Sequence, residues 1–147
     1  MKLAIGCDHG GIDLKIEIVK HLEERGIEFV DFGIKEYQSV NYPEIALPLA
    51  KAVASGECDR GILVCGTGIG MSMAANKVKG IRCALLSDVV SARLTREHND
   101  TNMMAIGAGV VGQMLALEIA DTWLGTEFSG EPRHQRRIDK LMAVEEA

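Results

Sequence analysis

The chain has 147 residues, with 16 Lys and Arg against 21 Asp and Glu, so its formal net charge is −5. Hydrophobic residues make up 47% of it, an ordinary value for a globular protein, and a chain of this length supplies one core rather than two. The acidic balance and the 4% of aromatic residues argue against a general nucleic-acid binder. No apolar run reaches the roughly 20 residues of a membrane helix and no signal peptide is recognisable, so we expect a cytoplasmic protein without membrane or nucleic-acid partners.

Four cysteines occur, at positions 7, 58, 65 and 83. Their spacing matches neither a zinc site nor a small disulfide-rich protein, so we expect reduced thiols and no bound metal. Free cysteine is usually a small buried hydrophobic residue, and this is the prediction for Cys58 and Cys83. Cys65 differs, because it begins a glycine-rich segment.

Short β-branched runs alternate with longer amphipathic runs along the chain. The run 12–25, for example, has apolar residues with the spacing of one helical face, and Gly26 follows as a stop signal. In chain order the pattern predicts a strand at 2–7, a helix at 12–25, a strand at 27–32, a helix at about 44–55, a strand at 61–65, a helix from the 66–70 loop to about 77, a strand at 81–86, a helix from a cap at Ser87–Asp88 to about 97, a weaker strand at 102–106, and helices at 111–124 and 132–145.

This alternation predicts an α/β fold in which a five-stranded parallel sheet has helices on both faces, a three-layer Rossmann-like arrangement. We expect one domain over 1–147, with a C-terminal helical arm from about 130. Among doubly wound orders we expect the flavodoxin-like order 2-1-3-4-5, because it makes strands 1 and 3 neighbours at the switch point where ligands bind. The loops after those strands are the most unusual segments, CDHGG (7–11) and CGTGIG (65–70).

The segment 65–70 leads from a strand through glycines into a helix. Glycines let the backbone aim several N–H groups at one point, and a helix N-terminus adds positive potential, so we expect an anion site. The segment is not a dinucleotide fingerprint, since it follows the third strand, and it lacks the Lys-Ser/Thr pair of a P-loop. Tight packing between strand and helix is the alternative explanation for its glycines.

Cys65 is the first residue of this segment. A helix N-terminus lowers the pKa of a thiol and favours the thiolate, which can take a proton or attack an electrophile. A base here needs a proton next to a carbonyl, and the same N–H groups would then hold an enediolate oxygen. No CxxC partner exists, so dithiol redox chemistry is not expected, and a structural role is the alternative.

Asp8 and His9 follow the first strand and should face the same edge of the sheet as the glycine-rich loop. A carboxylate and an imidazole at this place suit contacts with sugar hydroxyls or phosphate. The alternatives are a helix N-cap for Asp8 and a surface loop position for His9.

His98 lies in the segment REHND (96–100), and histidine can act as a general acid or base near pH 7. The fourth strand ends at the top of the sheet and the next helix runs back down. His98 should therefore lie at the bottom edge of its own subunit, away from Cys65. It is either a structural loop residue or part of a neighbouring chain's site, which requires a dimer.

The segment RHQRR (133–137) carries a group of cations. On a helix Arg133 and Arg137 share a face at i, i+4, and Arg136 lies close to them. Guanidinium groups on one face suit a phosphate dianion. The alternative is a solvated basic turn paired with acids such as Asp139.

Together these segments resemble the ribose-5-phosphate isomerase B family, which includes the galactose-6-phosphate isomerase subunits. The resemblance covers nearly the whole chain and rests on GCDHGG (6–11), NYPE (41–44), CGTGIGMSMAANK (65–77), GIR (80–82), REHNDTN (96–102) and RHQRR (133–137). It implies aldose–ketose isomerisation of a sugar phosphate without a cofactor, with ribose 5-phosphate and ribulose 5-phosphate as the leading pair. It also implies a homodimer, or a dimer of dimers, with active sites shared between subunits.

Carried onto this chain, the resemblance makes Cys65 the base that moves a proton between C1 and C2. Thr67 and the 66–70 backbone would hold the enediolate, and His98 from the other subunit would help open the furanose ring. The implied catalytic residues are thus Cys65, His98, Thr67 and Asp8. The implied substrate-binding residues are Asp8, His9, Tyr42, Gly66, Thr67, Gly68, Ile69, Gly70, Asn99, Arg133 and Arg137, with the phosphate held by His9 and the two arginines and the sugar lined by Tyr42.

One position departs from the family pattern. Members often carry an Arg in a G-x-R pattern after the fifth strand, whereas this chain has Gly107-Ala108-Gly109. One phosphate contact is therefore missing, and Arg136 is the extra cation that would compensate for it. The sequence therefore does not decide between substrates of different chain length, which are tetrulose 4-phosphates, ribose 5-phosphate, allose 6-phosphate and galactose 6-phosphate.

Two other classes of function are compatible with the sequence. One is a non-catalytic phosphosugar-binding subunit of a paired isomerase, against which the intact set of Cys65, His98 and arginines argues. The other is a nucleotide- or flavin-binding sensor on a flavodoxin-like sheet, which the arginine pattern disfavours.

Overall fold

A computed structural model describes all 147 residues. Five parallel strands form one sheet: β1 (Lys2–Cys7), β2 (Glu28–Asp31), β3 (Arg60–Cys65), β4 (Cys83–Leu85) and β5 (Met103–Gly107). The helices are α1 (Ile12–Glu24), α2 (Tyr42–Ala54), α3 (Ile69–Ala75), α4 (Val89–Asn99), α5 (Gln113–Gly125) and α6 (Pro132–Met142), and a 3-10 turn, η1 (Ala143–Glu146), follows α6. Every predicted element is present. None of these helices has the length and apolar composition that crossing a bilayer requires.

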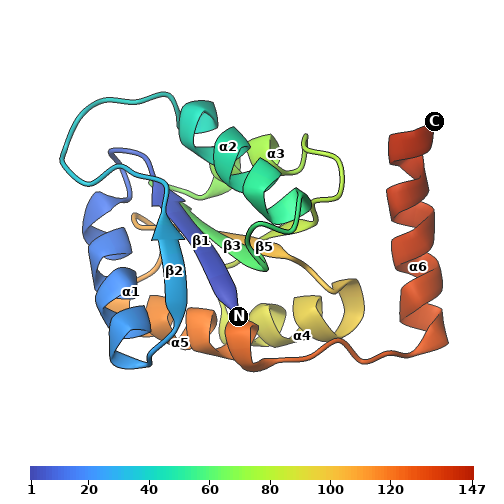
Figure 1. Ribbon diagram of the computed structural model, residues 1–147. Coiled ribbons are helices and arrows are strands. Elements are labelled where there is room, and N and C mark those ends of the chain that lie inside the picture. Colours follow the sequence, from blue (N-terminus) through green and yellow to red (C-terminus); the bar gives the residue numbers. More distant parts are fainter.

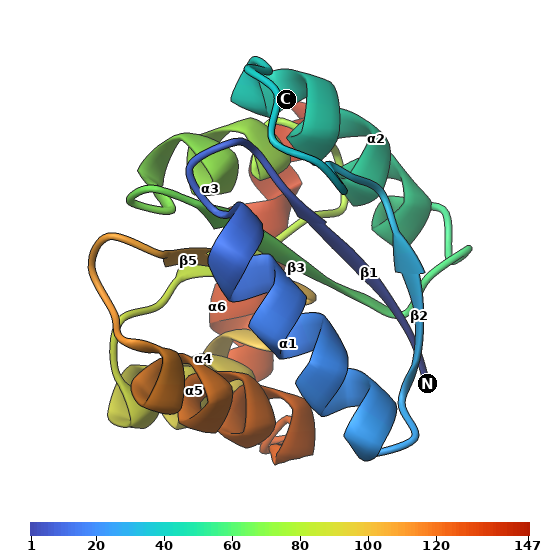
Figure 2. The same cartoon turned by 90° about the vertical axis from the view of Figure 1, so that its left-hand side faces the viewer.

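The sheet is the middle layer of three (Figures 1 and 2). Helices α1, α4 and α5 lie on one side of it, and α2 and α3 lie on the other. Successive residues of a strand point to opposite faces. Ile62 and Val64 of β3 therefore belong to the core beneath α1 and α5, whereas Leu63 and Cys65 belong to the core beneath α2 and α3. The predicted three-layer α/β fold is confirmed.

The strand order is β2-β1-β3-β5-β4, so the predicted order 2-1-3-4-5 is wrong in its last two strands. β5 pairs with β3 along its whole length, and all of its residues are buried. None of the three residues of β4 is fully buried, and Leu85 is 45% exposed. A continuous apolar run suits a central strand and a short, half-exposed one suits an edge. The observed order brings the loop after β5 beside the loop after β3.

Helix α6 forms an arm beside the body of the molecule, joined to α5 by an extended segment (Figure 1). Pro132 occupies the first turn of the helix, as predicted. The buried side chains of α6 are His134 and Ile138, which are four residues apart and share one face of the helix, and the helix contacts α4. The base of the arm is tied to α4, since the Ser129 N–H donates to the Glu97 carbonyl at 3.1 Å.

A buried ion pair fixes the loop after β2. Lys15 of α1 is 2% exposed, and its Nζ lies 2.8 Å from Asp31 Oδ2 and 2.7 Å from the Ile34 carbonyl oxygen. The other oxygen of Asp31 accepts the Gly33 N–H at 2.8 Å. The same loop continues to Val40, whose N–H donates to His9. The Lys15–Asp31 pair therefore also helps to position the chain that lies beside the loop after β1.

The two cysteines expected in the core differ in their surroundings. Cys58 is buried, as predicted, and desolvation raises the pKa of its thiol. Cys83 packs against the core beneath α2 and α3 but is only partly covered, and burial raises its pKa to about 12. Both thiols are therefore poor nucleophiles at neutral pH. The chain holds no group of three or more His, Cys, Asp or Glu side chains arranged to bind a metal ion.

Candidate active site

Cys65, the last residue of β3, lies at the head of a backbone cradle. Its buried Sγ accepts the Gly68 N–H at 3.0 Å. Gly68 has φ +78, and a Cβ there would lie 2.6 Å from Leu85 Cδ1 and 3.0 Å from the Ile106 carbonyl carbon. Only glycine fits both the backbone conformation and the space. The turn that points an N–H at the sulfur therefore depends on Gly68.

The next residues complete the cradle. Thr67 is exposed, and its Oγ1 accepts the Ile69 N–H at 3.2 Å. Tyr42, at the start of α2, covers Gly70, because a Cβ on that glycine would lie 2.7 Å from the tyrosine ring. Tyr42 is itself partly exposed, so part of its ring beside Gly70 is open to solvent.

The loop after β5 runs directly along the cradle. The Ala108 N–H donates to the Cys65 carbonyl at 2.8 Å, and the Gly109 N–H donates to the Gly66 carbonyl at 2.9 Å. Gly109, where the resemblance led us to expect an arginine, is thus in backbone contact with the cradle. A Cβ at Gly109 would lie 3.0 Å from the Gly66 oxygen and meet no other residue within 4 Å.

The loop after β1 meets the cradle from the other side, as expected for neighbouring strands. A Cβ on Gly10 would lie 3.0 Å from the Gly66 nitrogen, so the two loops touch. Asp8 is buried, and its Oδ1 accepts the Gly10 N–H at 2.8 Å. The residue before α1 is Gly11, which makes no side-chain cap, so the alternative role of Asp8 as a helix cap is wrong.

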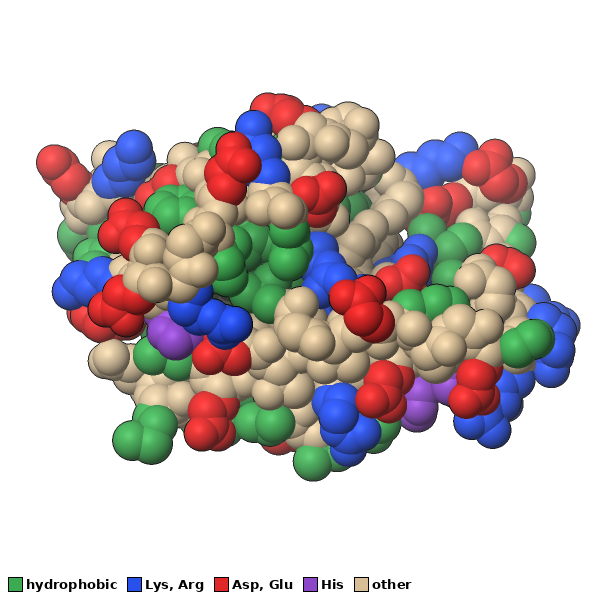
Figure 3. All heavy atoms as spheres, turned by 60° about the horizontal axis from the view of Figure 1, so that its bottom comes forward, with side chains coloured by type: hydrophobic (Ala, Val, Ile, Leu, Met, Phe, Trp, Pro, Cys, Tyr) green, Lys and Arg blue, Asp and Glu red, His purple; other side chains and the backbone are tan.

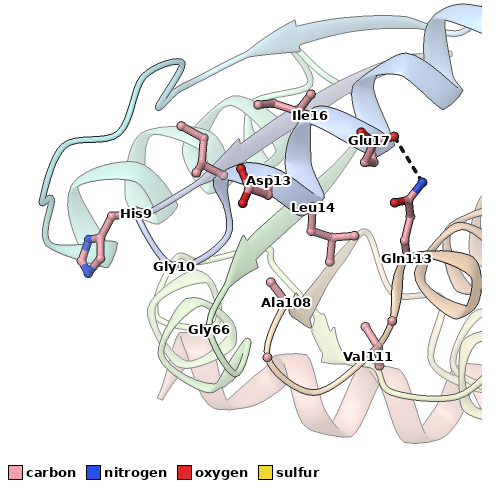
Figure 4. A pocket seen from close by; sticks show the side chains of 13 residues that line it. His9, Gly10, Asp13, Leu14, Ile16, Glu17, Gly66, Ala108, Val111 and Gln113 are labelled. Carbon is pink, nitrogen blue, oxygen red and sulfur yellow. Dashed lines mark hydrogen bonds between the residues drawn. The ribbon is translucent and has the colours of Figure 1, made fainter.

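His9 projects from the same loop. Its Nδ1 accepts the Val40 N–H at 3.3 Å, and its ring meets Tyr37 edge-on with centroids 6.2 Å apart. Figure 4 shows His9 at one end of a cleft that continues past Gly10 and Gly66 towards α1 and α5. The cleft holds about 650 Å³, and the side chains of Asp13, Glu17 and Gln113 lie on its far walls.

His98 and Asn99 lie in a second group, at the end of α4 and against α6. A pocket of about 300 Å³ is lined there by Arg82, His98, Asn99, His134, Arg137, Ile138 and Leu141. The rings of His98 and His134 are tilted by 37° to one another with centroids 4.3 Å apart, and the Ser129 hydroxyl is 2.7 Å from His134 Nδ1. Burial, and then the nearby His98 and Arg133, lower the pKa of His134. Figure 3 shows histidine and Arg/Lys side chains together at the base of α6, on the right of the view.

The turn that carries His98 is held by polar side chains. Asp100 ends α4 with φ +44, a conformation that non-glycine residues adopt when hydrogen bonds compensate. Buried Arg96 donates to Asp100 Oδ1 at 2.8 Å and to the Thr101 carbonyl at 2.7 Å. Arg82 donates to the Asn99 carbonyl at 2.9 Å and to the Asp100 carbonyl at 2.8 Å. The REHNDTN segment thus folds into a rigid end for α4.

The remaining cations of α6 lie on its exposed side. Arg133 pairs with Glu131 at 2.7 Å, and both side chains are about half exposed. Arg136 is exposed and does not line the His98 pocket. Asp139 accepts a hydrogen bond from Gln135, so it is not the acid that pairs with Arg133. Of the three predicted phosphate-binding arginines, the structure places only Arg137 in the pocket with His98.

The predicted site residues therefore form two separate groups in one chain. The cleft beside the cradle and the His98 pocket share no lining residue. The topology predicts this separation, since His98 lies in the last turn of α4, a helix that runs back from the cradle edge. Two polar members of the second group, Arg82 and His134, were not assigned roles from the sequence. In the sequence, the signal that could have pointed to them was their place inside the motifs GIR and RHQRR.

Comparison with known proteins places these motifs in one family. The family model described as Ribose/Galactose Isomerase matches residues 3–141. This chain belongs to the ribose/galactose isomerase family. Ribose-5-phosphate isomerase B of Escherichia coli is 52% identical over 145 residues, covering 99% of this chain and 97% of that protein.

Members of the family that are named for different substrates are similar to the chain. D-erythrulose-4-phosphate isomerase of Pectobacterium atrosepticum is 44% identical over 131 residues, covering 88% of this chain and 86% of that protein. Among solved structures, ribose-5-phosphate isomerase B of Clostridium thermocellum superposes with a TM-score of 0.97 at 54% identity, covering 99% and 98% of the two chains. The predicted resemblance and fold class are thereby confirmed.

Proposed function

We propose that this chain is a cofactor-independent aldose–ketose isomerase that interconverts ribose 5-phosphate and ribulose 5-phosphate through an enediolate. The observation that carries the proposal is the Cys65 sulfur held by the Gly68 N–H where the loops after β1, β3 and β5 meet. The similar proteins named ribose-5-phosphate isomerase B support the choice of this substrate pair.

In this mechanism the Cys65 thiolate removes the proton from C2 of the opened aldose. The C2–H electron pair forms the C1–C2 double bond, and the C1 carbonyl oxygen becomes the enediolate oxygen. The 66–70 backbone N–H groups and Thr67 stabilise that oxygen. The same sulfur then returns the proton to C1 while the proton of the C2 hydroxyl passes to the C1 oxygen, which leaves a hydroxyl at C1 and the carbonyl at C2. No redox partner is needed, since the substrate is oxidised at C2 and reduced at C1.

The other residues, from both groups and from the exposed side of α6, act on the rest of the substrate. His98, with Asp8 nearby, protonates and opens the furanose ring, and Asn99 binds hydroxyls. His9, Arg133 and Arg137 hold the phosphate, with Arg136 as an extra cation, and Tyr42 borders the sugar. The pocket lined by His98 and Arg137 shares no residue with the cleft beside the cradle, so the complete site needs two copies.

A homodimer with shared sites, or a dimer of dimers, is therefore part of the proposal. Exposed apolar side chains next to the cradle support it: Ile69 and Met73 of α3, and Leu85 on the edge strand β4. Such a cluster at a sheet edge is a common subunit interface. We further propose that residues 1–147 act as one cytoplasmic isomerase domain whose α6 arm serves the site of the neighbouring copy.

Other sugar phosphates are the second candidate substrates. Gly109 touches the cradle without a side chain, so the place where relatives carry an arginine is open. This favours comparing tetrulose 4-phosphates, allose 6-phosphate and galactose 6-phosphate with ribose 5-phosphate. A phosphosugar-binding subunit that needs a catalytic paralogue is the remaining alternative.

The test measures ketose formation from four-, five- and six-carbon aldose phosphates, with a metal chelator and without nucleotide. We expect turnover of ribose 5-phosphate by the wild type and a loss of at least about 100-fold in kcat for Cys65→Ala, the usual effect of removing a general base. Phosphate binding should persist in that variant, and Cys58→Ala is the matched control at a buried cysteine away from the cradle. Absence of turnover with every substrate would refute the isomerase proposal.

A further inference from the structure

The C-terminal turn is bound to the loop that precedes β4. Both oxygens of the Glu145 carboxylate accept the Gly80 N–H, at 3.1 and 2.9 Å, although the two residues are 65 positions apart. Gly80 has φ +91, a conformation that favours glycine. The neighbouring Lys79–Glu146 pair measures 2.6 Å, but both of its side chains are mostly exposed. Glu145, rather than Glu146, therefore makes the directed contact with the backbone.

A chain of hydrogen bonds leads from this contact to the His98 turn. The Gly80 carbonyl accepts Asn102 Nδ2 at 2.9 Å, and Asn102 Oδ1 accepts the Arg82 N–H at 2.9 Å. The Arg82 guanidinium in turn donates to the carbonyls of Asn99 and Asp100. The C-terminal turn and the end of α4 are thus attached to the same short segment, 80–82.

Little packing supports the upper part of the arm. A cavity of about 540 Å³ separates the end of α6 and η1 from β4 and α4, with Met142 and Val144 on one side and Cys83 and Thr95 on the other. At its base the arm is tied to α4 through Ser129. Its position over the His98 pocket thus depends on a contact at each end.

We propose that Glu145 is a positioning residue that clasps the tip of α6 to Gly80 and so sets the distance between Arg137 and the His98–Asn99 turn. The inference rests on the proposed function, in which Arg137 binds the substrate phosphate beside His98. A clasp of this kind acts on phosphate binding and not on the proton transfer at Cys65. Loss of the carboxylate should therefore raise KM and leave kcat nearly unchanged.

The experiment compares Glu145→Ala with Glu146→Ala, a matched removal of the adjacent carboxylate. For Glu145→Ala we expect KM for ribose 5-phosphate and the inhibition constant of inorganic phosphate to rise about tenfold, which corresponds to about 1.4 kcal/mol. We expect kcat to stay within about twofold of wild type, because the transition-state contacts at the cradle are intact. Glu145→Gln, which keeps one acceptor oxygen, should recover part of the loss, and Glu146→Ala should match wild type.

Hydrogen exchange of the Gly80 amide tests the clasp without reference to activity. It should be faster in Glu145→Ala than in wild type or Glu146→Ala. Unchanged Gly80 exchange, or an unchanged KM accompanied only by a lower melting temperature, would overturn the proposal. If the wild type isomerises no sugar phosphate, the proposed function fails. The clasp is then judged by Gly80 exchange and by calorimetric binding of inorganic phosphate, and equal phosphate binding by both variants would overturn it.

Discussion

Replacing Gly68 by Ala tests whether the cradle's geometry is built on that glycine. The new Cβ would lie 2.6 Å from Leu85 Cδ1 and 3.0–3.1 Å from backbone atoms of Ile106. The flexible leucine can move away, but the β5 backbone is held by its pairing with β3. The cradle turn must therefore shift, and with it the N–H that bonds the Cys65 sulfur.

The size of the effect follows from two costs. A non-glycine residue at φ +78 costs about 1–2 kcal/mol, and crowding against a fixed backbone costs about 1–3 kcal/mol. Together we expect a loss of roughly 2–5 kcal/mol in the free energy of unfolding, or roughly 5–20 °C in Tm. Displacement of the N–H should also lower kcat by about 100-fold or more, as loss of an oxyanion donor does.

Gly66→Ala is the control in the same loop. A Cβ on Gly66 would meet nothing within 4 Å, and its φ is not positive, so its stability should stay within about 0.5 kcal/mol of wild type. Urea denaturation and calorimetry of both variants, followed by steady-state kinetics of Gly68→Ala, make the comparison. Equal stability of the two variants would refute the argument that Gly68 is required by its surroundings.

Three further predictions concern the shared site, the buried ion pair and pH. Mixing Cys65→Ala with His98→Ala, each inactive alone, should restore part of the activity through hybrid dimers. If mass spectrometry shows subunit exchange and no activity returns, Cys65 and His98 act in the site of one chain. Asp31→Ala leaves Lys15 buried without its carboxylate and should lower the free energy of unfolding, measured by urea denaturation, by about 3–5 kcal/mol. The double change Lys15→Met/Asp31→Ala should recover much of this loss. A single variant as stable as the double one would contradict the argument. The pKa of His134 is lowered in the folded chain, so its contribution to stability is present above the unfolded pKa of about 6.5 and lost as pH falls below it. The free energy of unfolding of the wild type should therefore fall more steeply below about pH 6.5 than that of His134→Gln, and parallel pH curves would count against this assignment.

The architecture could be predicted where the local signals are strong. The apolar runs of β1 and β3 mark buried strands, and Asp88 caps α4 as expected, accepting the Ser91 N–H at 2.6 Å. The order of the last two strands could not be predicted from local signals. It depends on which of the two pairs with a neighbour on both sides and which lies at the edge of the sheet. The half-exposed residues of β4, compared with the wholly buried β5, decide it only in three dimensions.

The candidate site also has one part that could be predicted from the sequence and one part that could not. Its cradle is local in sequence, so the glycines of 65–70 predict it directly. The surroundings of His98 are assembled from distant segments. Arg82 reaches the end of α4 from the loop before β4, and His134 reaches it from the arm. The spacing of residues along the chain does not predict such contacts. The placement of His98 away from Cys65, by contrast, follows from the direction of the helix alone.

The backbone contact between Gly109 and Gly66 has an evolutionary consequence. The Cys65 sulfur is held by a main-chain N–H, and residue 109 supports the same cradle through its backbone alone. A side chain gained there would meet the Gly66 oxygen and otherwise extend away from neighbouring residues. Under the proposed function, a single codon change could therefore add a side chain beside the cradle while the main-chain groups around the sulfur are inherited unaltered.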